Sequence, residues 1–153
     1  MDILKIDSNY KKQYKVMIVD DDEEFCTLIC LVLKKTKMFS MIITAPSVYI
    51  AQQKMLNQRF DLLLVDYKLP QRTGLQLIYN LRRMMGYSNT KVILISGHFG
   101  NKEVIEAFNT GVKHILVKPF SNQLLVKKIH EILNLPMKKM ILDEEDLNLN
   151  LKK

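Results

Sequence analysis

The amino-acid sequence predicts an α/β domain built on a doubly wound parallel sheet. Five short apolar runs recur along the chain, at residues 16–19, 41–44, 62–65, 92–95 and 115–117. Longer stretches with helical spacing separate these runs, and this alternation favours parallel strands joined by helical crossovers. Because such crossovers are right-handed, the helices cover both faces of the sheet. The 153 residues are enough for one domain with its own core.

Each stretch between two strands, and the one after the last strand, has the pattern of a helix. The predicted helices cover residues 23–37, 47–58, 75–85, 101–110 and 122–134. The first begins beside acidic residues and ends in KKTK, which suits the helix dipole at both ends. Gly111 marks the end of the fourth helix. We expect an N-terminal extension over 1–14, the domain over 15–135, and a tail or linker over 136–153.

Composition indicates a folded, water-soluble chain. Nearly half of the residues are apolar and a quarter are charged. No apolar run approaches the roughly 18–20 residues of a membrane span, and the N-terminus lacks the apolar stretch of a secretory signal. We therefore expect a cytoplasmic protein without a membrane partner. The net charge of +7 comes mostly from dispersed lysines, which favours a solvated surface over a nucleic-acid site.

Polar side chains follow four of the five predicted strands. Asp20 and Asp21 end the first strand, Asp66 ends the third, Ser96 the fourth and Lys118 the fifth. Doubly wound sheets bind their ligands outside the carboxyl ends of the strands. The sequence thus gathers carboxylates, a hydroxyl and an ammonium at the edge where a ligand is expected.

This set of groups suits magnesium and phosphate. Two carboxylates about 4 Å apart repel by about 4 kcal/mol at an effective dielectric of 20, so either some of them are protonated or a cation lies among them. Oxygen ligands without histidine or thiolate favour Mg²⁺. Cys26 and Cys30 make a poor metal site on their own and are expected to be reduced thiols. A hydroxyl and an ammonium can bind phosphoryl oxygens, and a carboxylate can form an aspartyl-phosphate. Asp66 is best placed for this because it ends the most apolar strand.

Each of these residues also has an ordinary structural explanation. Asp22 and Glu23 are expected to cap the first helix and occupy its first turn. Lys118 alone could be a surface lysine, and Ser96 with Gly97 could form a turn. Asp66, however, precedes the loop YKLPQRTG and not a helix. The meeting of all four strand ends at one edge favours a functional site.

Four segments together resemble the receiver domain of bacterial two-component response regulators. They are VMIVDDDEEF, FDLLLVDYKLPQRTGLQLI, VILISG and HILVKPF, and the resemblance spans residues 15–135. It implies the flavodoxin-like fold of the chemotaxis response regulator, with five parallel strands in the order 2-1-3-4-5 and five helices. It also implies a signalling domain whose only chemistry is its own phosphorylation and dephosphorylation.

The resemblance implies roles for individual residues. Asp66 matches the phosphoacceptor. Asp21 matches the acid that binds Mg²⁺ directly, Asp20 the acid that acts mostly through water, and the backbone carbonyl of Lys68 the third protein ligand. This ligand set makes Mg²⁺ the implied cofactor.

Further matches concern the phosphoryl group and the switch. Ser96 matches the hydroxyl that moves toward the phosphoryl group, and Lys118 the lysine that pairs with its oxygens. Many family members carry an aromatic switch residue three positions before that lysine, where this chain has Ile115. We therefore expect phosphorylation without the aromatic part of the switch.

The resemblance also implies partners. The phosphoryl donor is a sensor histidine kinase or a histidine phosphotransfer protein, and the activated domain binds a downstream protein. The predicted helix 23–37 has too many apolar residues for one buried stripe, so we expect some of them to be exposed and to contact the kinase.

Other interpretations remain open. The chain could be a receiver module excised from a hybrid kinase or a DNA-binding regulator, or an interaction module that is not phosphorylated. A magnesium-dependent phosphatase with an aspartate nucleophile is disfavoured. Such an enzyme needs a second acid where this chain has Lys68, and a cap domain for which there is no length.

Overall fold

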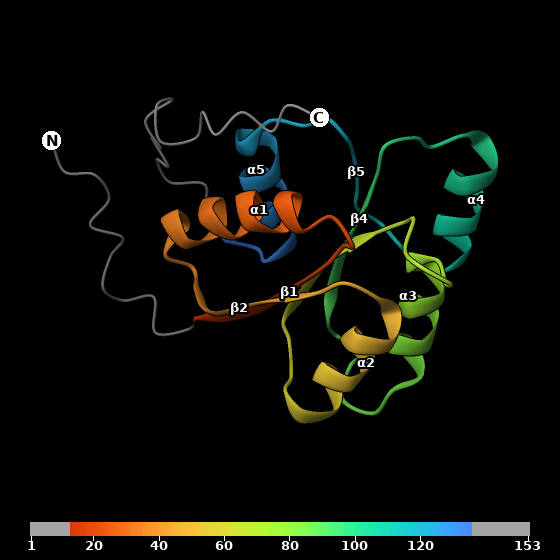
Figure 1. Ribbon diagram of the computed structural model, residues 1–153, viewed down its shortest axis with the longest axis horizontal. Coiled ribbons are helices and arrows are strands. Elements are labelled where there is room, and N and C mark those ends of the chain that lie inside the picture. The colour runs from red at the N-terminus through yellow and green to blue at the C-terminus, as the bar shows by residue number, and fades with distance from the viewer. Residues whose placement is uncertain (1–12, 136–153) are drawn as a thin grey trace, which may run out of the picture.

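The computed structural model describes residues 13–135, which form one parallel sheet flanked by helices (Figure 1). The sheet contains five strands in the order β2-β1-β3-β4-β5. The strands are β1 (Tyr14–Val19), β2 (Phe39–Ala45), β3 (Leu62–Asp66), β4 (Lys91–Ser96) and β5 (Ile115–Val117). The helices are α1 (Glu23–Thr36), α2 (Val48–Asn57), α3 (Gly74–Arg83), α4 (Asn101–Asn109) and α5 (Asn122–Ile132). The predicted fold and strand order are confirmed.

Element boundaries differ from the sequence prediction by a few residues. β1 and β2 both begin two residues early, because Tyr14 pairs with Phe39 and extends the ladder. α3 begins at Gly74 and ends at Arg83, which shifts it toward the N-terminus of the predicted range 75–85. Nearly all of the predicted extension 1–14 and the whole predicted tail 136–153 lie outside the described residues.

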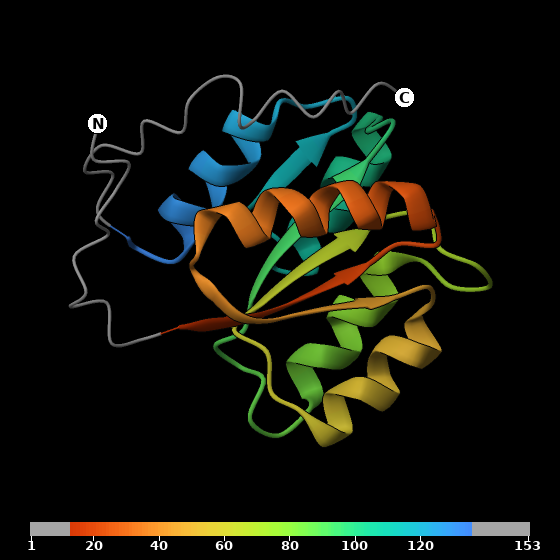
Figure 2. The same ribbon diagram turned by 60° about the vertical axis from the view of Figure 1, so that its left-hand side comes forward.

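Alternation along the strands divides the core between the two faces of the sheet. In β1, Val16 and Ile18 pack against α1 and α5, whereas Met17 and Val19 face the other helices. Figure 2 shows α1 in front of one face and α2 and α3 below the other. All four residues of β3 from Leu62 to Val65 are fully buried, as expected for the middle strand of a covered parallel sheet.

Side-chain caps fix where four of the helices begin. Asp22 accepts a hydrogen bond from the Phe25 amide at 3.1 Å, which confirms the capping role predicted for it. Ser47 and Ser121 cap α2 and α5 in the same way, and Thr73 forms a capping box with Gln76 at α3. These caps lie in the loops that follow the strands, so they also shape the edge where the polar residues gather.

The helices of the described region are short. None of those between residues 13 and 135 is both long and apolar enough to cross a bilayer.

One buried polar side chain lies in the helical layer away from the predicted site. His130 of α5 is 7% exposed, and among the described residues neither of its ring nitrogens has a hydrogen-bond partner. Burial lowers the pKa of His130 below its ordinary value of 6.5. The imidazole is therefore held in its neutral form.

We predict that His130 makes the fold sensitive to acid. Because its pKa is lower in the folded chain, the unfolded chain binds more protons as the pH falls through about 6.5, and stability declines. Replacement of His130 by Leu removes this contribution to the pH dependence of stability. Urea unfolding at about pH 7.5 and about pH 5.5 should show a smaller loss of stability for His130→Leu than for the wild type. Equal losses in the two chains would contradict the prediction.

Candidate functional site

The predicted site residues meet at the carboxyl edge of the sheet. Backbone hydrogen bonds continue the ladders beyond the strands, from the Asp20 amide to Ala45 and from the Lys118 amide to Ser96. These bonds hold the ends of β1, β2, β4 and β5 in register. Asp66, the last residue of β3, lies between them in the strand order.

Three carboxylates form a compact acidic cluster at this edge. Asp20 is buried, Asp66 is half-buried and Asp21 is exposed, and one carboxylate oxygen of each lies within 4.8 Å of the others. An all-oxygen cluster of this size suits a hard divalent cation. The sequence predicted this grouping, including the separation of Asp22, which caps α1 instead.

Lys118 bridges two of the carboxylates. Its ammonium donates a hydrogen bond of 2.9 Å to Oδ2 of Asp20 and lies 3.6 Å from Oδ2 of Asp66. The other oxygen of Asp20 accepts a hydrogen bond of 2.9 Å from the Asp22 amide. Asp20 is thus fixed from both sides, while Asp66 keeps a carboxylate that is only loosely paired.

The pKa values at the site follow from burial and from these charges. Burial, followed by the charge of Asp20, raises the pKa of Asp66 to about 6, although Lys118 opposes the shift. Burial alone would lower the pKa of Lys118, but the hydrogen bond with Asp20 and its charge raise it above the ordinary value. Lys118 therefore stays charged, and the ionised form of Asp66 is disfavoured.

The loop after β3 holds Asp66 through its backbone. The Lys68 amide donates a hydrogen bond of 3.3 Å to Oδ1 of Asp66, and the Gly74 amide donates one of 2.8 Å to the carbonyl of Tyr67. Gly74 packs so closely that a Cβ atom there would overlap the Asp66 carbonyl oxygen. The loop can therefore close onto the end of β3 only with glycine at this position.

Ser96 is near the cluster, but its hydroxyl is engaged elsewhere. The side chain is 5% exposed. Its Oγ donates to the His98 carbonyl at 2.9 Å and accepts from the His98 amide at 3.2 Å. Ile115 is half-buried and packs against the core on the α2–α3 face. Ser96 thus lies at the carboxyl end of β4, whereas Ile115 is the first residue of β5 and pairs with Leu94.

The two cysteines have no place in a metal site. Cys26 is buried and Cys30 is half-buried, and both are free thiols. Burial, together with the charge of Asp20, raises the pKa of Cys26 to about 12. The Cys26 thiol stays protonated and donates to the Asp20 carbonyl at 3.5 Å, as expected for a core thiol.

One contact at the site is absent from the sequence prediction. The ammonium of Lys118 lies over the face of the Phe25 ring, 4.0 Å from its centroid. Phe25 belongs to the predicted apolar helix, and nothing in the spacing of residues 25 and 118 along the sequence indicates that they meet.

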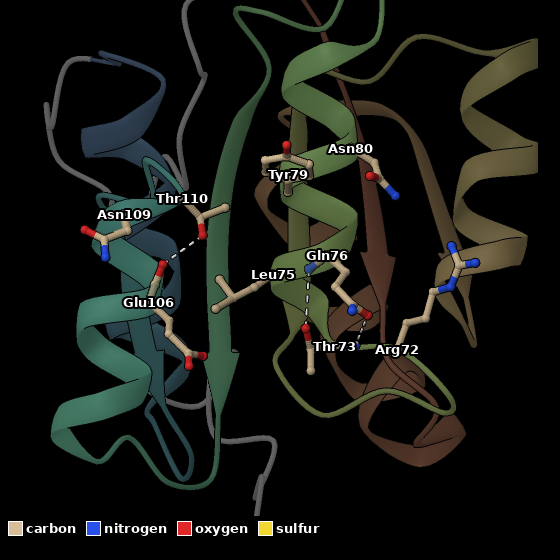
Figure 3. Close-up of a pocket in the computed structure, with 9 residues that line it drawn as sticks. All are labelled: Arg72, Thr73, Leu75, Gln76, Tyr79, Asn80, Glu106, Asn109 and Thr110. Carbon is tan, nitrogen blue, oxygen red and sulfur yellow. Dashed lines mark hydrogen bonds between the residues drawn. The ribbon is translucent and has the colours of Figure 1, made fainter.

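A groove between α3 and α4 contains none of the predicted site residues (Figure 3). Its lining consists of Arg72, Thr73, Leu75, Gln76, Tyr79, Asn80, Glu106, Asn109 and Thr110. Glu106 connects the groove to the loop after β3, because it accepts a hydrogen bond of 3.3 Å from the Tyr67 hydroxyl.

The fold and the site define a class of protein, namely signalling domains that carry a phosphoacceptor carboxylate at the edge of a parallel sheet. The sequence model of one such family, the response regulator receiver domain, matches residues 16–130 of this chain. The chain belongs to this family. It is a receiver domain of two-component signalling, a phosphoacceptor rather than an enzyme, and receiver domains work with a kinase partner.

Curated relatives agree with this assignment. The chemotaxis protein CheY homolog of Campylobacter jejuni is 27% identical over 119 residues, which cover 78% of this chain and 92% of that protein. A protein-glutamate methylesterase/protein-glutamine glutaminase of Sulfurimonas denitrificans is 30% identical over 110 residues, or 71% of this chain and 30% of that protein.

Solved structures agree on the fold. The chemotaxis protein CheY4 of Vibrio cholerae superposes with a TM-score of 0.74 at 24% identity, covering 79% of this chain and 99% of that one. A CheY-like receiver domain protein of Methanospirillum hungatei gives a TM-score of 0.70 at 24% identity, with 80% and 95% covered.

We predict that ionisation of Asp66 destabilises the metal-free fold. Its pKa is raised in the folded chain, so the folded chain holds the proton more tightly, and stability falls as the pH rises from about 4 to about 6. The Asp66→Asn variant has no carboxyl group to ionise at this position, so it does not lose stability in this way. In EDTA, the urea midpoint of the variant should exceed that of the wild type by more at about pH 7.5 than at about pH 4.5. A difference that is independent of pH would refute the prediction.

Proposed function

We propose that Asp66 accepts a phosphoryl group from a phosphohistidine of a sensor histidine kinase or a histidine phosphotransfer protein. A carboxylate oxygen of Asp66 attacks phosphorus, the phosphorus–nitrogen bond breaks, and the histidine ring leaves with the bonding electrons and takes up a proton. The observation that supports this most directly is the bridge by Lys118, which lies 2.9 Å from Asp20 but 3.6 Å from Asp66. Asp66 thus has an ammonium beside it without being fully paired.

The residues at the site fit Mg²⁺ as the cofactor. The carboxylates of Asp20, Asp21 and Asp66 and the backbone carbonyl of Lys68 would hold the ion, with Asp20 acting mostly through water. The metal supplies charge neutralisation for the incoming phosphoryl oxygens. The chain itself positions the acceptor, because the Lys68 amide and the Gly74 turn fix the end of β3.

Phosphorylation changes the charge at this edge and thereby the surface that the domain presents. An added phosphoryl group contributes roughly −1.5 to −2 charge and three acceptor oxygens. Lys118 pairs with one of them, and the Ser96 hydroxyl exchanges its bonds with His98 for another. The loop after β4 repacks, and a downstream protein binds the altered surface. Because position 115 is an isoleucine, no aromatic side chain takes part in this change.

Helix α1 provides the surface for the phosphodonor. It begins beside the acidic cluster, and Leu31 on its outer face is 42% exposed, while Phe25 and Leu28 are half-buried. Leu31 is therefore an apolar side chain of this helix that a partner can reach. We place the domain, residues 15–135, in the cytoplasm, where kinases of this kind act on it.

Phosphorylation can be tested with a small phosphodonor such as acetyl phosphate. After incubation with Mg²⁺, intact-mass spectrometry should show one labile phosphoryl adduct on the wild type and none on Asp66→Asn. EDTA should abolish the adduct, because the carboxylates then repel the donor. An adduct that persists in Asp66→Asn would place the acceptor elsewhere. A wild type that binds neither phosphoryl group nor Mg²⁺ would identify an interaction module that is not phosphorylated.

Kinase docking is tested separately with Leu31→Glu. With a histidine kinase that phosphorylates the wild type, the variant should accept phosphoryl groups more slowly, because a charge replaces an apolar contact. Phosphorylation by acetyl phosphate should be unchanged. Leu56→Glu on α2, where the leucine is 70% exposed on the other face, is the matched control. Equal kinase rates for Leu31→Glu and the wild type would remove α1 from the docking surface.

A further inference from the structure

Phe25 belongs to a closed circuit of contacts around the buried carboxylate. Asp20 accepts a hydrogen bond from the Asp22 amide, and Asp22 accepts one from the Phe25 amide. The Phe25 ring lies under the Lys118 ammonium, which donates back to Asp20. The first turn of α1 thereby fixes the ring relative to both the lysine and its carboxylate partner.

A second aromatic side chain packs against the Phe25 ring. Phe120, two residues after Lys118, meets Phe25 edge-to-face, with centroids 6.2 Å apart and an interplanar angle of 89°. Phe120 is buried, and the side chain of Lys118 is only 22% exposed. The ring therefore contacts the same loop that carries the lysine, and it shields one side of the ammonium from water.

The face of an aromatic ring attracts a cation without neutralising it. At 4.0 Å from the centroid, the Lys118 ammonium is well within the roughly 6 Å range of this attraction. A carboxylate at position 25 would instead pair with Lys118 and reduce its attraction for a phosphoryl group. An aliphatic side chain would fill the space but lack this attraction, so that only the hydrogen bond to Asp20 would hold the ammonium.

We propose that Phe25 is a positioning residue for Lys118, holding the ammonium over its ring so that it is aimed at a phosphoryl group on Asp66. This proposal rests on the proposed function. The ammonium donates a hydrogen bond to Asp20, whereas Asp66 lies farther away, at 3.6 Å. The Phe25 ring covers a second side of the ammonium and offers it no hydrogen-bond acceptor. The direction toward Asp66 is left for a phosphoryl oxygen.

The first readout is the affinity for beryllofluoride, a mimic of a phosphoryl group, at saturating Mg²⁺, together with the rate of phosphorylation by acetyl phosphate. A small donor is used because α1 is also the proposed kinase surface. Phe25→Leu should weaken beryllofluoride binding and slow phosphorylation by about five-fold, whereas Phe25→Tyr should match the wild type. Fluorinated phenylalanines at position 25 should give graded losses, since fluorine weakens the negative ring face with little change of shape.

The second readout is independent of phosphorylation. In the metal-free protein, the ε-methylene protons of Lys118 should be shifted upfield by the ring in the wild type and in Phe25→Tyr, and should lose this shift in Phe25→Leu. Phe39→Leu is the matched control. Phe39 is half-buried against the same core cluster, but it lies at the amino end of β2, away from the site.

The outcomes separate the two proposals. If Phe25→Leu binds beryllofluoride as the wild type does, Lys118 needs no positioning and the inference is wrong. A loss in Phe25→Leu with a flat fluorinated series would mean that Phe25 acts by packing alone, which also overturns it. If the wild type itself takes up neither phosphoryl group nor beryllofluoride, the proposed function fails, and the inference falls with it.

Discussion

The ion pair between Lys118 and Asp20 joins residues 98 positions apart and organises the whole edge of the sheet. Because β3 and β4 separate β1 from β5 in the strand order, Lys118 must reach across the strand ends to make this contact. Asp20 is buried, and an unpaired buried charge costs about 3–5 kcal/mol when its partner is removed. The pair therefore ties the last strand to the first, and it fixes an ammonium beside Asp66.

A single ammonium cannot balance three carboxylates. Asp20, Asp21 and Asp66 together carry three negative charges against the one positive charge of Lys118, so the ionised site retains an excess that a divalent cation would cancel. The raised pKa of Asp66 has related causes, namely its burial and the negative charge of Asp20. The site thus combines one strong pair, which keeps its geometry, with one strained carboxylate, which is left available for chemistry.

The sequence predicted the features that depend on local pattern. The apolar runs and the helical spacing predict the fold, and the rule that parallel strands end at one edge predicts that Asp20, Asp66 and Lys118 lie together. Contacts that depend on side-chain direction were missed. The Phe25 ring meets Lys118 only because the capped first turn of α1 aims it there, and the Ser96 hydroxyl turns to His98 instead of the carboxylates. Periodicity carries no information about either contact.

The repulsion among the clustered carboxylates affects both the stability and the function of the site. If Asp66 were as fully hydrogen-bonded as Asp20, its ionisation would cost little, but its oxygens would also be less available to a metal or to phosphorus. The loop instead gives Asp66 one backbone donor at 3.3 Å and a rigid backbone through Gly74. The metal-free fold is less stable as a result. The Asp66 carboxylate, however, is already positioned to bind the cation and the phosphoryl group. Rigidity comes from the backbone and from Asp20, and reactivity comes from the incomplete pairing of Asp66.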